Sequence, residues 1–224
     1  TTGEISAQIL HFAQQLRRDN THITNVVFMG MGEPMLNFDA VWQTIRNLND
    51  PEGMSLGARR FTISTVGIVP GIERLARESL AVGLAVSLHA PDDTLRDRLI
   101  PANKRYPLDR LLAATKLYVE RTGRRVTFEY ALIDGLNDSD NHARHVARIL
   151  QGLLCHVNLI PMNPTIGCAY QPSPQERILR FQEILTKAHI QTTVRLRRGL
   201  DLDAGCGQLR GRYTASPAEG KSTG

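Results

Sequence analysis

The stretch NVVFMGMGEPMLNFDA, residues 25–40, decides the fold, because an apolar run leads directly into a glycine-rich turn. Val26 to Met29 has the branched, apolar composition of a buried strand. The two glycines of the turn let the backbone approach a ligand closely, and the proline that follows stops further strand pairing. The pattern predicts that Glu33 lies at the mouth of a parallel sheet, although an ordinary strand-to-helix turn with a solvated carboxylate has the same pattern.

The same combination of apolar run and helical segment recurs along the chain. This alternation is typical of βα units around a parallel sheet, so we predict an α/β fold. The expected strands are Asn25–Met29, Arg60–Ser64, Gly83–Leu88, Arg125–Ile133, Cys155–Ile160 and Thr192–Leu196. The expected helices are Gly3–Arg18, Phe38–Leu48, Pro70–Ser79, Thr94–Leu99, Leu108–Thr122, Ser139–Leu150 and Ser173–Ala188. Phe38 and Trp42, at helical spacing, are interpreted as core packing and not as a platform for base stacking.

Length and composition fit one domain with a substantial core, because 42% of the 224 residues are hydrophobic. We expect this domain to span residues 3–212 and residues 213–224, which are small and polar, to form a disordered tail. The chain begins almost directly with a helix, so a barrel of βα units would lack its first strand, and we expect a fragment. No segment has the length of a membrane span or the form of a signal peptide, so the expected location is the cytoplasm.

The formal net charge is +5, and arginines are concentrated near the C-terminus. They are Arg195, Arg197, Arg198, Arg210 and Arg212. Such clustering fits a polyanionic partner such as a nucleic acid, and a solvated surface would look the same.

Three cysteines without CxxC spacing argue against a disulfide framework and against a self-contained zinc or iron–sulfur site. Cys155, at the start of an apolar run, fits a buried small hydrophobic residue. Cys206 lies between two glycines in a basic segment, which favours an accessible thiol, so it is a candidate nucleophile. Cys168 lies in a loop without such neighbours and is assigned no role.

Polar residues follow most of the expected strands. Ser64 ends one strand, the run Ser87-Leu88-His89 follows the next, and Asn163 follows a later one. Taken singly, each is as well explained by a helix cap, a structural histidine or a turn. Because the ends of parallel strands meet at one edge of the sheet, their recurrence suggests a ring of ligand contacts.

Six motifs in order carry a family resemblance: VVFMGMGEPMLN, RRFTISTVGIVPGI, LAVSLHAPDDTLRDRLIPANKRYPL, VTFEYALIDGLNDSDNHA, VNLIPMNP and DLDAGCGQLRG. Together they resemble the RlmN family, the dual-specificity RNA methyltransferases of the radical S-adenosylmethionine superfamily. The resemblance covers residues 3 to about 212. It implies a partial (β/α)6 barrel and methylation of carbon 2 of adenine in 23S ribosomal RNA and in transfer RNA.

The resemblance also implies roles for individual residues. Gly32 and Glu33 resemble the turn that binds the amino group of S-adenosylmethionine, for which a carboxylate is electrostatically suited. Further contacts to the cofactor's ribose, carboxylate and adenine are implied for Ser64, Ser87, Leu88, His89 and Asn163. Cys206 resembles the cysteine that accepts a methyl group and becomes S-methylcysteine. A thiolate is a good methyl acceptor, whereas the adenine carbon is a poor nucleophile.

The family also uses a [4Fe-4S] cluster, an electron donor and a resolving cysteine that forms a disulfide. The CxxxCxxC motif for the cluster does not occur in this sequence, so the resemblance places its ligands upstream of Thr1, together with an N-terminal RNA-binding domain. The 224 residues by themselves are expected to bind no cluster, to lack turnover, to be monomeric and to have no membrane partner.

Three alternatives stay open at this point. The related Cfr enzymes share most of these motifs and methylate carbon 8 of the same ribosomal adenine. A nucleotide- or phosphate-binding barrel without radical chemistry would explain the glycine-rich strand ends. A non-enzymatic RNA-binding remnant would explain the basic C-terminus and the missing cluster motif.

Overall fold

A single parallel sheet organises the chain in the computed structural model, which describes residues 1–162 and 170–195. The six strands pair in the order in which they occur in the sequence, and every pair is parallel. They are β1 (Val26–Phe28), β2 (Phe61–Thr65), β3 (Gly83–Ser87), β4 (Val126–Leu132), β5 (Cys155–Pro161) and β6 (Gln191–Val194). Such an order without reversals is the topology of an open, partial barrel.

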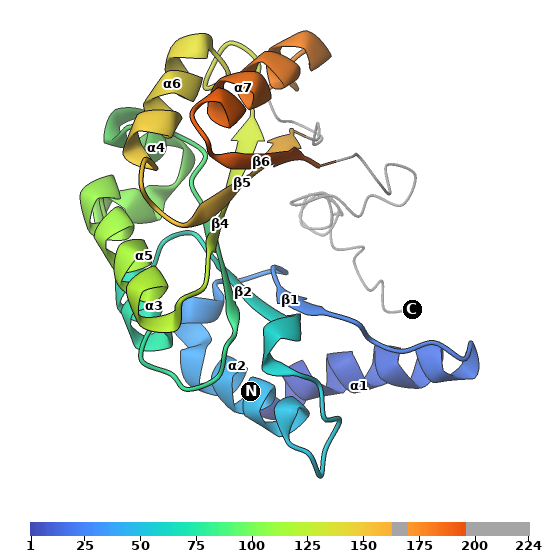
Figure 1. Ribbon diagram of the computed structural model, residues 1–224. Helices are drawn as coiled ribbons and strands as arrows, with labels where there is room; N and C mark the ends of the chain where they lie inside the picture. The colour runs from blue at the N-terminus through green and yellow to red at the C-terminus, as the bar shows by residue number, and fades with distance from the viewer. Residues whose placement is uncertain (163–169, 196–224) are drawn as a thin grey trace, which may run out of the picture.

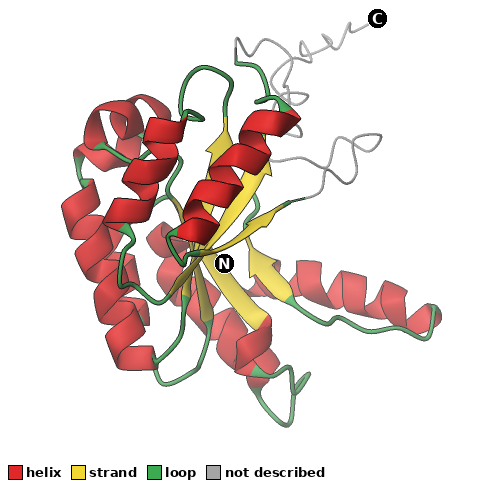
Figure 2. Ribbon diagram, turned by 45° about the horizontal axis from the view of Figure 1, so that its top comes forward, coloured by secondary structure: helices red, strands yellow, loops and turns green. Residues whose placement is uncertain are grey.

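Helices accompany the strands, and those that connect one strand to the next cover the outer, convex side of the curved sheet (Figure 1). They are α1 (Thr2–Arg18), α2 (Phe38–Asn49), α3 (Val69–Leu75), α4 (Asp93–Leu99), α5 (Leu108–Thr122), α6 (Asp140–Ile149) and α7 (Gln175–Lys187). Short 3-10 helices lie at Pro34–Asn37 (η1), Ala58–Arg60 (η2) and Pro101–Lys104 (η3). The helix α1 projects away from the sheet in both orientations (Figures 1 and 2), and none of its residues is buried.

Local sequence explains where these helices begin and end. The hydroxyl of Ser139 accepts a hydrogen bond from the N–H of His142 and starts α6, and the carboxylate of Asp92 accepts from Leu95 N–H and starts α4. The helix α5 ends at Gly123, whose φ of 64° is the left-handed conformation that glycine adopts without steric cost.

Alternate residues of each central strand face two different environments, because the side-chain period of a strand is two residues. In β4, Phe128, Tyr130 and Leu132 are fully buried in the core between sheet and helices. Thr127 and Glu129 face the opposite, concave side, which carries no helix among residues 1–162 and 170–195. One face of the sheet therefore packs against the helices, and the other carries polar side chains that no helix of residues 1–162 and 170–195 covers.

The predicted fold class is confirmed, since all six strands and all seven helices occur within a few residues of the expected ranges. The 3-10 helices were not predicted. Phe38 and Trp42 stack in the core with ring centroids 5.8 Å apart, and Cys155 is buried, as expected. Leu196, the last residue of the sixth expected strand, and the proposed tail at 213–224 lie outside the described residues. None of the described helices has both the length and the apolar character needed to cross a membrane.

Candidate functional site

The turn after β1 is fixed by the carboxylate of Glu33. Its Oε1 accepts a hydrogen bond from the N–H of Met35 at 3.0 Å, which caps η1, and its Oε2 accepts from the N–H of Val66 at 2.8 Å. Val66 directly follows β2, so Glu33 joins the loops at the ends of two strands. Gly32 has a φ of 92°, a conformation that a residue with a side chain rarely adopts. The turn is thus shaped by both residues that the sequence singled out.

The loop after β2 is a tight turn held by a threonine. The hydroxyl of Thr65 accepts hydrogen bonds from the N–H groups of Gly67 and Ile68 at 3.1 and 3.2 Å. Ser64 precedes it on the concave side of the sheet and is 8% exposed. The register pairs Ser64 with Ala85 of β3. Ser87 follows Ala85 by two residues, so its side chain is on the same face. Two of the predicted serines therefore lie on one face of neighbouring strands.

Leu88 and His89, after β3, are positioned by hydrogen bonds to β4, made by the backbone of Leu88 and by the side chain of His89. The side chain of Leu88 is fully buried in the core, and its N–H donates to the carbonyl of Glu129 at 2.9 Å. His89 has a φ of 55°, in the left-handed region. This conformation turns the ring of His89 towards β4, where its Nδ1 accepts a hydrogen bond from Ala131 N–H at 3.0 Å.

The imidazole of His89 is neutral. Burial of the ring and the nearby positive charge of Arg96 lower its pKa from 6.5 to about 4. Because Nδ1 accepts the bond from Ala131, the single proton of the neutral ring is on Nε2. His89 therefore offers a hydrogen-bond donor whose protonation does not change across the physiological pH range.

A polar row that the sequence reasoning missed crosses the concave face beside these loops. The register aligns Ser87, Glu129, Asn158 and Thr193 on neighbouring strands. Glu129 is 7% exposed, and its Oε2 accepts a hydrogen bond from Asn158 Nδ2 at 2.8 Å. Burial raises the pKa of Glu129, while the bond from Asn158 and the charge of Arg195 act in the opposite direction. In the sequence, polar residues alternate with apolar ones in the runs that form β4 and β5, and this alternation could have indicated the row.

Several predicted residues lie outside the described part of the chain. These are Asn163, Cys206 and all of the C-terminal arginines except Arg195, and Cys168, which was assigned no role, lies there too. Within residues 1–162 and 170–195, no group of three or more His, Cys, Asp or Glu side chains is placed to hold a metal ion. Cys155 is the one cysteine in those ranges, and burial raises the pKa of its thiol to about 11, so it does not fit an iron–sulfur cluster, whose ligands are thiolates.

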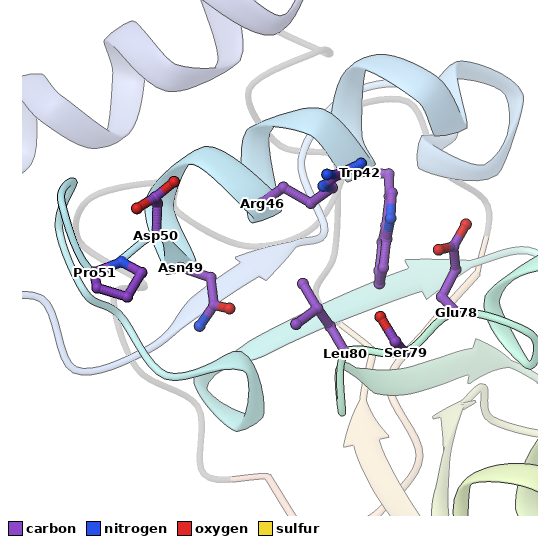
Figure 3. A pocket seen from close by; sticks show the side chains of 8 residues that line it. All are labelled: Trp42, Arg46, Asn49, Asp50, Pro51, Glu78, Ser79 and Leu80. Carbon is purple, nitrogen blue, oxygen red and sulfur yellow. The ribbon is translucent and has the colours of Figure 1, made fainter.

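A recess of about 400 Å³ lies near the amino ends of β2 and β3 (Figure 3). Its lining comes from α2 and the turn after it and from the segment before β3, including Trp42, Arg46 and Leu80. These segments lead into the amino ends of β2 and β3, whereas Glu33, Ser64 and His89 lie at the carboxyl ends of β1, β2 and β3. The recess is therefore separate from the predicted ring of ligand contacts.

The profile of the Radical SAM superfamily matches residues 6–146, which include the turn after β1 and the ends of β2 and β3. The chain belongs to this superfamily. A crystal structure of a radical SAM methyltransferase from Sphaerobacter thermophilus superposes with a TM-score of 0.91 and is 55% identical, over 93% of this chain and 61% of that one. The radical SAM fold of the described residues is thus independently supported.

Curated relatives of this radical SAM chain carry RNA methyltransferase names. A probable dual-specificity RNA methyltransferase RlmN from Chloroflexus aurantiacus is 50% identical over 96% of the chain and 60% of the relative. A ribosomal RNA large subunit methyltransferase N from Nitrosopumilus maritimus is 47% identical over 92% of the chain and 58% of the relative. The chain thus spans about three fifths of the length of these relatives.

Proposed function

We propose that this chain is the S-adenosylmethionine-binding core of an RNA methyltransferase that acts on carbon 2 of adenine in 23S ribosomal RNA and in transfer RNA. The observation that carries the proposal is that the carboxyl ends of β1, β2 and β3, each with one of the quoted motifs, lie along one edge of the sheet, which we call the rim. This arrangement occurs in a chain about half identical to relatives named RlmN. The activity belongs to the whole protein, of which these residues form a part.

The rim offers groups that match the parts of the cofactor. Glu33 supplies a half-buried carboxylate for the ammonium group, Gly32 gives the turn its shape, and Ser64 and Ser87 supply hydroxyls near the ribose and carboxylate. His89 donates from Nε2. The predicted contact of Leu88 is restricted to its backbone, because its side chain is in the core. Asn163 completes this proposed set from outside the described residues.

Cys206 is proposed to accept the methyl group. Its thiolate attacks the methyl carbon, the bond between that carbon and the sulfonium sulfur breaks, and S-adenosylhomocysteine leaves with the electron pair. The cofactor set of the family, S-adenosylmethionine and a [4Fe-4S] cluster, requires cysteine ligands that the described residues do not provide. In our proposal those ligands, and the site that receives electrons from a donor protein, lie outside this chain. Since its proposed substrates are cellular RNAs, we propose a cytoplasmic location. A monomer stays a prediction from the family resemblance.

Cofactor binding is tested with the full-length protein encoded by the gene. Equilibrium dialysis with S-adenosylmethionine compares the wild type with Glu33→Gln and with Glu52→Gln, a matched change at an exposed carboxylate in the turn after α2. We expect Glu33→Gln to weaken binding at least tenfold and Glu52→Gln to leave it unchanged. Equal affinities of all three proteins would remove Glu33 from the site, and a wild type that does not bind would refute the proposed function.

The reaction itself is tested by mass spectrometry of RNA from a strain that lacks the gene. Complementation with the wild type is expected to restore 2-methyladenine in 23S ribosomal RNA and transfer RNA, and Cys206→Ala is expected to restore none. A methyl group at carbon 8 instead would favour the Cfr-type reaction. Full methylation by Cys206→Ala would favour a function without the cysteine intermediate.

A further inference from the structure

Arg96, in the short helix α4, is fully buried, which is unusual for an arginine. All three of its side-chain nitrogens donate hydrogen bonds. Nε donates to the carbonyl of Leu88 at 3.1 Å, and Nη2 donates to the carbonyls of Val66 and Ser87, both at 2.8 Å. Nη1 donates to Oδ1 of Asn103 at 2.6 Å. Three of the four acceptors are backbone carbonyls at the ends of β2 and β3.

The charge of this guanidinium is balanced indirectly. Asn103, which accepts from Arg96, donates from its own amide to Asp93 at 2.9 Å and to Asp97 at 2.7 Å. A buried charge without partners costs several kcal/mol, so the bonds to Asn103 and the two nearby carboxylates explain how the charge is tolerated. Burial lowers the pKa of Arg96 to about 10, which leaves it protonated at neutral pH.

These bonds continue into the turn that contains Glu33. Val66 donates its N–H to the carboxylate of Glu33 and accepts at its carbonyl from Arg96. Arg96 in turn holds Ser87 and Leu88. An unbroken series of hydrogen bonds therefore joins the loops after β1, β2 and β3, which carry the proposed contacts to the cofactor.

The packing around the guanidinium leaves little room for it to move. Gly67 lies directly against it, because a Cβ at Gly67 would be 3.1 Å from Nη2 of Arg96. The hydrogen bonds between β2 and β3 fix the spacing of the two strands along their length. They do not fix the loops that follow the last of these bonds. The guanidinium supplies that constraint, since its planar donors have a fixed relative geometry.

We propose that Arg96 is a positioning residue of the cofactor site, which holds the loops after β2 and β3 at the separation that S-adenosylmethionine requires without contacting it. This inference rests on the proposed function of the same site. It assigns a role in ligand affinity to a residue that faces the interior of the protein.

The test compares full-length proteins that carry Arg96→Lys, Arg96→Met or Tyr118→Phe. Lysine keeps the charge but cannot reach all four acceptors, and methionine keeps only the apolar volume. Tyr118→Phe is the matched control, because it removes one buried hydrogen bond, from the Tyr118 hydroxyl to the carbonyl of Val82 at 2.7 Å. That bond lies at the amino end of β3, away from the rim.

Each variant is measured for thermal stability and, at a temperature where it is folded, for its Kd for S-adenosylmethionine. We expect the affinity to fall in the order Arg, Lys, Met, with at least a tenfold loss for Arg96→Lys. Tyr118→Phe should lose stability and keep the wild-type Kd. An unchanged Kd for folded Arg96→Lys would overturn the proposal, as would an equal loss for Tyr118→Phe. A wild type without measurable binding would instead refute the proposed function.

Should neither Arg96 variant fold, Asn103→Ala provides the decision. This change removes the side-chain acceptor that orients Nη1 and leaves the guanidinium in place. We expect a several-fold weaker Kd from a folded protein. A wild-type Kd for Asn103→Ala would then count against the positioning role of Arg96.

Discussion

The largely enclosed imidazole of His89 should make the stability of the protein depend on pH. Its pKa is about 4 in the folded state, because of burial and the charge of Arg96, and about 6.5 in an unfolded chain. Between these two values the unfolded state binds more protons, so stability falls as the pH falls. The loss begins as the pH drops through about 6.5 and is complete below about 4. Since one pKa unit corresponds to about 1.4 kcal/mol, the whole effect is about 3 kcal/mol.

Urea denaturation at about pH 7 and about pH 5 measures most of this loss, for which we expect about 2 kcal/mol. The comparison is His89→Asn, because asparagine tolerates the left-handed backbone at this position and does not titrate. The variant should lose about 2 kcal/mol less than the wild type over the same interval, whatever its absolute stability. Proton NMR of the imidazole provides a direct check. A His89 resonance that titrates near its ordinary pKa, or equal losses in both proteins, would refute the reasoning.

Three further predictions follow from packing and backbone geometry. Gly67 has a φ of 111° and faces Arg96, so Gly67→Ala should lower the free energy of unfolding in urea by about 1–3 kcal/mol. A Cβ at Gly57 would meet no atom within 4 Å, so Gly57→Ala should not lower it, and equal effects would contradict this account. Phe128 is fully buried, so Phe128→Ala should cost about 3–5 kcal/mol, and a loss below about 1 kcal/mol would show that it is not core. The thiol of Cys155, with a pKa of about 11, should resist iodoacetamide at neutral pH until the protein unfolds; mass spectrometry that finds it alkylated in the native protein would disprove its burial.

Elements with strong local signals could be predicted from the sequence. The helix Leu108–Thr122 has the expected bounds, because a proline precedes it, Gly123 ends it and its apolar face is continuous. The turn at Glu33 was likewise visible, since glycine and proline mark turns regardless of what surrounds them. The short helices η1 and η3 were missed, because four residues are too few to show a period.

Residues whose partners are backbone carbonyls could not be found from sequence. Arg96 occurs in a short, highly charged segment, and arginines in such segments are usually solvated. Its carbonyl partners come from residues that could have any side chain, so no pattern of residue types reveals them. Glu129 alternates with apolar residues in its run, which indicates its face, but its bond from Asn158 depends on the register of the next strand, which the sequence alone does not give.

The two faces of β4 have a consequence for how the sequence of this sheet could be changed. Phe128 and Tyr130 point into the core while Thr127 and Glu129 point to the concave side, so neighbouring residues of the strand meet different packing constraints. Replacing only the positions of β3, β4 and β5 that face the concave side would leave the core packing as it is. A combinatorial library restricted to those positions could therefore be screened for altered ligand preference without a matching loss of folded protein.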